Sequence, residues 1–123
     1  MKTFTDGDMF AINTWRIARG LPAQDRSLYP RIGLVEPQVA AGFLYATDSC
    51  LCMLDGFITN PNASMLKRGR ALDKIADVLI ELARHHGYKR IVAISSNGGI
   101  LRLAEKKGLS YEPGLFQVYT KEL

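Results

Sequence analysis

Three cationic side chains stand close together in the chain, at Lys67, Arg68 and Arg70. They lie at the start of a segment with helical periodicity, and a helix N-terminus presents unpaired backbone N–H groups. The small residue Gly69 would let the backbone approach a bound group closely. Cations and free N–H groups together suit phosphate, so the spacing predicts a phosphate-binding turn that feeds a helix. A solvated basic turn that only caps a core helix is the alternative interpretation.

The sulfur and imidazole side chains favour neither a disulfide nor a metal site. Cys50 and Cys52 are two residues apart in a strand-like run, so their side chains would share one face, about 7 Å apart. That spacing disfavours a disulfide between them and fits a reducing compartment. With only these cysteines and the adjacent His85 and His86, we expect no metal site.

Charge and composition limit the class of protein and of partner. Lys and Arg total 16 against 12 Asp and Glu, and the formal net charge of +4 suits a small anionic ligand as well as nucleic acid. The chain lacks the aromatic and basic stripe that reads single-stranded nucleic acid, so nucleic acid is not the expected partner. No apolar stretch approaches the roughly 18 residues of a membrane span, and the first residues lack a signal-peptide core. We therefore expect a cytoplasmic protein with no membrane partner.

The elements that must position the basic group follow from periodicity and turn residues. The strands are expected over residues 1–4, 31–35, 39–46, 50–59, 90–95 and 116–121, and the helices over 9–18, 71–86 and 97–107. Residues 62–68 are expected to form a polar loop. Asp55-Gly56 is a common hairpin-turn dipeptide, but the apolar stretch after it is short, which favours one long strand with a glycine bulge.

The order of these elements predicts the fold class. The strands at 31–35, 39–46 and 50–59 follow one another with short connections, which indicates antiparallel pairing. A helix separates 50–59 from 90–95, which indicates a parallel crossover. The 123 residues suit one domain. We expect a single α+β domain over residues 1–123, with a mixed, mostly antiparallel twisted sheet flanked by helices.

Several stretches resemble the GNAT N-acetyltransferase superfamily. The run Val39-Ala-Ala-Gly-Phe43 is similar to text of the family's third strand. The run Ile58-Thr-Asn-Pro61, followed by Gly69-Arg-Ala-Leu72, resembles the fourth strand and the phosphate loop, with the family's spacing. Residues 97–109 resemble the last helix and the "K-x-G-F" that follows it. The loop departs from the family where Ser64 replaces Gln or Arg and Lys67 replaces the first glycine.

This resemblance implies acetyl-coenzyme A as co-substrate and a place for each part of it. The end of the fourth strand, Phe57, Ile58 and Thr59, would splay from the fifth strand and offer backbone groups to the pantetheine arm. The phosphate loop would comprise Lys67, Arg68, Gly69, Arg70 and Ala71. Asn97 corresponds to an asparagine that often contacts the cofactor, although it could equally serve only as a helix N-cap.

The chemistry of acetyl transfer needs a base for the amine and an acid for the departing thiolate. Asp55 corresponds to the carboxylate that the family often uses as the base; a bulge or turn aspartate is the alternative interpretation. Many members carry the acid as a tyrosine in the last helix, where this chain has Ala104. Tyr111 and Ser96 are candidates for its replacement.

Three functions are consistent with these features. The first is an N-acetyltransferase for an amine acceptor, in a compact form similar to the short GNAT domains of bacteriophages. The second is a GNAT-fold protein without catalysis that serves as a binding or structural subunit, which the altered loop and Ala104 favour. The third, a nucleic-acid-binding module, depends on net charge alone. Residues 20–37 and the Pro113-Gly114 turn are the expected acceptor region, and related folds often form homodimers through terminal strands.

Overall fold

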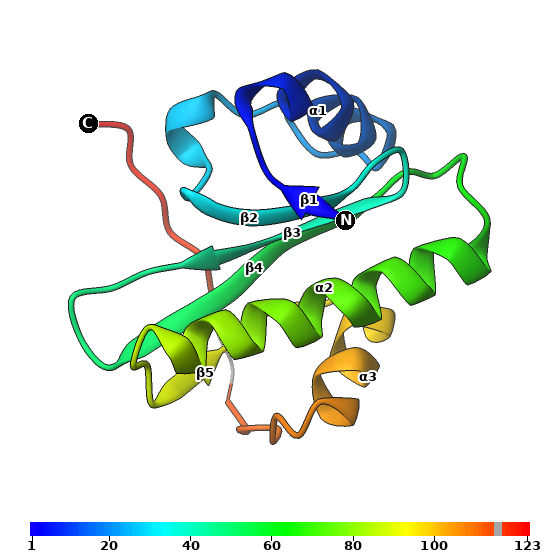
Figure 1. Cartoon of the computed structure of the whole chain (residues 1–123). Helices are drawn as coiled ribbons and strands as arrows, with labels where there is room; N and C mark the ends of the chain where they lie inside the picture. Colours follow the sequence, from blue (N-terminus) through cyan, green and yellow to red (C-terminus); the bar gives the residue numbers. More distant parts are fainter. Residues whose placement is uncertain (115–116) are drawn as a thin grey trace.

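The computed structural model describes residues 1–114 and 117–123. Its strands form one sheet in chain order (Figure 1), and antiparallel pairing joins the first strand to the second, the second to the third and the third to the fourth. These strands are β1 (Lys2–Thr3), β2 (Ile32–Glu36), β3 (Ala40–Tyr45) and β4 (Leu51–Thr59). The fifth, β5 (Arg90–Val92), pairs parallel with β4. The mixed, mostly antiparallel sheet predicted from the sequence is confirmed.

Helices cover both faces of this sheet. Helix α1 (Met9–Ala18) lies on one face and α2 (Met65–His85) crosses the other, with α3 (Gly98–Lys106) on the same side as α2 (Figure 1). Short 3₁₀ turns at Asp6–Asp8 and Arg26–Leu28 complete the α1 side. Within residues 1–114 and 117–123, no helix is long and apolar enough to cross a membrane.

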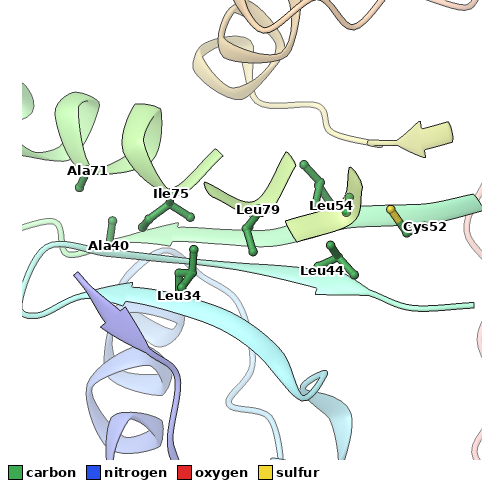
Figure 2. Close-up of a cluster of buried hydrophobic side chains, with 9 residues drawn as sticks. Leu34, Ala40, Leu44, Cys52, Leu54, Ala71, Ile75 and Leu79 are labelled. Carbon is green, nitrogen blue, oxygen red and sulfur yellow. The ribbon is translucent and has the colours of Figure 1, made fainter. Parts of the chain in front are cut away.

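The core between α2 and the sheet follows from the spacing of small and branched residues along the helix. Ala71, Ile75, Leu79 and Ala83 recur every four residues, so they share one face, and all are buried. They pack against strand residues that include Leu34, Leu44 and Leu54 (Figure 2). Burial of each large aliphatic side chain stabilises the fold by about 1.5–3 kcal/mol. This packing fixes the position of the α2 N-terminus beside the end of β4.

The opposite core is built from aromatic rings. Ile12 and Trp15 of α1 are buried against the sheet, beside Phe4, Tyr29 and Phe43. The Phe4 and Phe43 rings meet edge to face with centroids 5.0 Å apart, an arrangement that aromatic quadrupoles favour. Helix α1 is thereby held so that its last turn reaches the end of β4.

A glycine bulge shapes the middle of β4, as predicted. The register between β3 and β4 shifts between Ala41 and Phe43, and Gly56 has φ +69°. A left-handed backbone is easy for glycine and strained for other residues. Across the bulge, a Cβ on Gly42 would come within 2.7 Å of the Phe57 ring. The glycine in β3 therefore gives the Phe57 ring room to lie against the sheet.

Two predicted boundaries are wrong, and one predicted strand is not seen in its described residues. Helix α2 begins at Met65 rather than at residue 71, so the predicted loop over 62–68 ends at Ser64. Strand β5 ends at Val92 rather than at residue 95. The last strand, predicted over 116–121, begins at a residue outside the described part of the chain, and its described residues 117–121 have no regular structure.

Candidate functional site

Divergence of two parallel strands opens the candidate site. β4 and β5 pair only from Leu51 with Arg90 to Met53 with Val92. Beyond Met53, β4 continues to Thr59 while the chain after β5 turns toward α3. A cleft of about 1240 Å³ lies there, lined by the end of β4, the first three turns of α2 and the face of α3. A cleft of this size can enclose a ligand as large as a nucleotide cofactor.

Most of the residues predicted to bind a cofactor line this cleft. The lining includes seven of the nine: Phe57, Ile58, Thr59, Arg68, Gly69, Arg70 and Asn97. The other two, Lys67 and Ala71, do not line it. Ala71 is buried in the core beneath α2, and Lys67 is an exposed residue of the first helical turn.

The predicted phosphate loop is in fact helix. Ser64 is the N-cap of α2, and its hydroxyl accepts a hydrogen bond from the Lys67 amide at 3.2 Å. The Arg68 amide donates to the Ser64 carbonyl, so the residues from Arg68 onward have helical partners. The amides without an intrahelical acceptor are those of Met65 and Leu66, one turn earlier than predicted. Gly69 lies in the second turn, where an added Cβ would meet nothing within 4 Å.

Cationic side chains dominate the wall of the cleft. Arg19, Arg68, Arg70, Lys74, Arg102 and Lys106 line it, against the two carboxylates of Asp73 and Asp77. Hydrogen bonds from Lys106 and Lys107, both at 2.9 Å, hold the pKa of Asp73 below its ordinary value. Since Asp73 is thus neutralised, the net field in the cleft is positive and suits a polyanionic ligand.

One nitrogen of a guanidinium that lines the cleft is buried without a partner among the described residues. The Nε of Arg68 is buried and has no hydrogen-bond acceptor among the described residues. A buried donor without an acceptor costs about 1–3 kcal/mol, and more when the group is charged.

The open edge of β4 offers backbone groups to the same cleft. The Asn60 amide donates to the Val39 carbonyl at 2.8 Å, toward β3. In an antiparallel pair, the backbone groups of successive residues point alternately toward and away from the partner strand. The N–H and C=O groups of Phe57 and Thr59 therefore point away from β3. Arg19, at the end of α1, donates to the Thr59 carbonyl at 3.1 Å and to its hydroxyl at 2.6 Å. The Phe57 backbone groups face the open edge beside this contact.

Asp55 lies beside a second, smaller cavity that adjoins the cleft. The cavity measures about 70 Å³, and Phe57, Ile100 and Leu103 line both spaces. Asp55 is exposed, and Ala104 lines the cavity with it. The acidic residue and the residue at the tyrosine position therefore line the same cavity, although 49 positions separate them in sequence.

Tyr45 is a polar neighbour of Asp55 that the sequence reasoning missed. Tyr45 is half-buried and pairs with Met53, which places it diagonally across from Asp55 on the α1 face of the sheet. Burial raises the pKa of the Tyr45 hydroxyl, and the Asp55 carboxylate raises it further. The hydroxyl therefore keeps its proton at neutral pH. The strand register was needed to find this pair, because the spacing in sequence carries no signal for it.

The remaining candidates are placed as follows. The Asn97 side chain accepts a hydrogen bond from the Ile100 amide at 3.1 Å, so it is the N-cap of α3 as well as a cleft residue. Tyr111 and Ser96 are exposed, and neither lines the cleft or the cavity. Ser95 lines the cavity in their stead.

Comparison with known proteins supports the fold. No family model and no curated protein sequence matches the chain. Among solved structures, a probable acetyltransferase superimposes with a TM-score of 0.68 at 16% identity, over 99% of this chain and 96% of the other. A Trypanosoma brucei acetyltransferase superimposes with a TM-score of 0.67 at 11% identity, over 97% of each chain. The chain therefore has the mixed α+β fold of these acetyltransferase structures, with a mostly antiparallel sheet flanked by helices.

Proposed function

We propose that the chain binds an acyl-coenzyme A, acetyl-coenzyme A in the simplest case, and transfers its acyl group to an amine. The observation that carries this proposal is the assembly of one cleft from the open β4 edge, the N-terminus of α2 and a ring of cationic side chains. The acetyltransferase structures with this fold support the same ligand class.

The residues of the cleft fit the parts of coenzyme A. The amides of Met65 and Leu66, at the positive end of the α2 dipole, are placed to bind the pyrophosphate. Arg68 and Arg70 add charge-assisted donors. The pantetheine amides pair with the backbone of Phe57 at the open edge of β4.

The reacting end of the ligand then lies at Asp55. When bound, acetyl-coenzyme A supplies a thioester that an amine nitrogen can attack, so that a C–N bond forms, the C–S bond breaks and coenzyme A leaves as the thiolate. Asp55, which is exposed, accepts the proton of the incoming ammonium, directly or through water. The protonated Tyr45 hydroxyl beside it helps to orient the amine.

A specific observation favours a second function, a coenzyme A-binding protein without catalysis. Ala104 lines the small cavity where many GNAT enzymes place the tyrosine that protonates the thiolate. Loss of a general acid lowers a rate by about 10²- to 10⁴-fold. The two functions predict the same ligand and differ only in turnover.

Thiol release from acetyl-coenzyme A in the presence of amine mixtures separates the two. An enzyme should release coenzyme A, and Asp55→Asn should lower the rate by about 10²-fold or more with unchanged ligand affinity. Binding without amine-dependent release would select the second function. Full activity of Asp55→Asn would show that Asp55 is not the base.

A further inference from the structure

The small cavity beside Asp55 is apolar and is bounded by three alanines. Ten of its thirteen lining residues are hydrophobic. Ala76 comes from α2, Ala93 from the chain after β5 and Ala104 from α3, so short side chains stand on three separate walls. A larger residue at any of these positions would fill the space, and the cavity therefore exists because all three are alanine.

Its position along the cleft matches the thiol end of coenzyme A. The cavity touches α2 at Ala76, ten residues after Leu66, which is about 15 Å along a helix. An extended pantetheine arm is about as long as that separation. With the pyrophosphate at the first turn of α2, the sulfur reaches Phe57, which lines both the cleft and the cavity.

The cavity offers few polar partners to a guest. A buried water needs two to four polar partners, and apolar cavities stay empty of it. Of the three polar lining residues, Lys107 already donates to Asp73 at 2.9 Å and to Asp77 at 2.8 Å. Only Asp55 and Ser95 remain for a polar guest, whereas a hydrocarbon chain contacts every other wall.

We infer that this cavity holds the carbon chain of the acyl group and that the protein prefers propionyl and butyryl thioesters to acetyl. A cavity of about 150 Å³ holds a benzene ring, so about half that volume holds about three carbon atoms beyond the carbonyl. The inference rests on the proposed binding of acyl-coenzyme A and names the acyl class that the site selects. Ala104, which removes the acid expected of the fold, supplies the space for the longer chain.

Calorimetric titration of the full chain with coenzyme A and its acetyl, propionyl, butyryl and hexanoyl thioesters tests this inference. Each methylene transferred from water into the cavity should tighten binding about fourfold, corresponding to ~0.8 kcal/mol. Propionyl-coenzyme A should thus bind about fourfold, and butyryl-coenzyme A about fifteenfold, more tightly than acetyl-coenzyme A. The hexanoyl thioester should bind no more tightly than the butyryl thioester. Equal affinities across the series would overturn the inference.

Variants that fill the cavity give an independent readout. Ala104→Leu should remove the advantage of butyryl over acetyl and leave the affinity for free coenzyme A unchanged. Ala93→Val, on a different wall, should act in the same direction if Ala104→Leu fails to fold. Ala18→Leu, an exposed change on α1, is the matched control and should keep the advantage.

The outcomes separate this inference from the proposed function. Binding of coenzyme A with no dependence on acyl length contradicts the inference and leaves the proposed function standing. A butyryl advantage that survives both filling variants places the acyl chain elsewhere and also contradicts it. No binding of coenzyme A or of any thioester would overturn both.

Discussion

Arg19 is joined to Thr59, forty residues further along the chain, by two hydrogen bonds: Nε to the backbone carbonyl at 3.1 Å and Nη2 to the hydroxyl at 2.6 Å. This contact connects the last turn of α1 to the end of β4 at the point where β4 has no partner on its outer side. The contact therefore ties α1, on one face of the sheet, to the end of β4, which lines the cleft.

Arg19→Ala should weaken the ligand site more than the fold. The side chain is exposed, so loss of its hydrogen bonds should lower the free energy of unfolding by only about 1 kcal/mol. Coenzyme A affinity should fall by about tenfold, because a cleft cation is lost and the β4 edge is released.

The matched control for Arg19 is Arg16→Ala on the same helix. Arg16 donates to the Pro22 carbonyl at 2.9 Å and does not line the cleft. Urea unfolding and calorimetry on both variants make the comparison. Equal loss of affinity in the two variants would mean that Arg19 has no special place in the site.

Gly69 allows a paired test of space in the cleft. Because an added Cβ meets nothing within 4 Å, Gly69→Ala should stabilise α2 by up to about 1 kcal/mol and leave ligand binding intact. Gly69→Trp should also fold, since the position faces open space, but should abolish the ligand-induced rise in melting temperature. An unchanged ligand-induced rise in the melting temperature of Gly69→Trp would show that the ligand does not bind beside Gly69 of α2.

The contacts of Asp73 predict an acid-sensitive attachment of α3. Lys106 and Lys107 hold the pKa of Asp73 below its ordinary value of 3.8. A carboxyl with a depressed pKa in the folded state stabilises the fold above its unfolded pKa, and this contribution is lost as pH falls through the folded pKa. Asp77 and then Asp73 raise the pKa of Lys107 above 10.5, so the contribution of that group is lost only in strong alkali.

Melting temperatures of the ligand-free chain between pH 7 and pH 3 make this test. Asp73→Asn should melt lower than the unaltered chain at pH 7, and the two curves should converge below about pH 4. Asp48→Asn, in an exposed loop, should leave the curve unchanged. A constant difference between the chain and Asp73→Asn down to pH 3 would show that the charge of Asp73 does not hold α3.

Most of the fold could be predicted because its signals are local. The α2 periodicity at Ile75 and Leu79, the turn before Val39 and the bulge at Gly56 each specify an element within a few residues. The start of α2 was misplaced because Gly69 suggested a loop, whereas the Ser64 cap and the helix-forming residues around the glycine outweigh its cost.

The site was predictable only where a motif is continuous in sequence. The predicted runs from Phe57 to Thr59 and from Arg68 to Arg70 line the cleft, and each could be selected because it is one short stretch of sequence. Arg19 and Tyr45 were missed because they reach the site through tertiary contact and strand register. The cavity at Ala104 was likewise hidden, since its walls come from α2, β4, α3 and the chain beside β5.

The most direct test of the acyl-coenzyme A site is the melting temperature of the full chain with coenzyme A, with acetyl-coenzyme A and with inorganic pyrophosphate as the simple anion. Both coenzyme A ligands should raise it in proportion to the logarithm of concentration, well beyond pyrophosphate. Arg68→Met should lose most of the rise, whereas Arg84→Met, outside the cleft on the same helix, should keep it. No rise at millimolar coenzyme A, or an equal rise with pyrophosphate, would contradict the site.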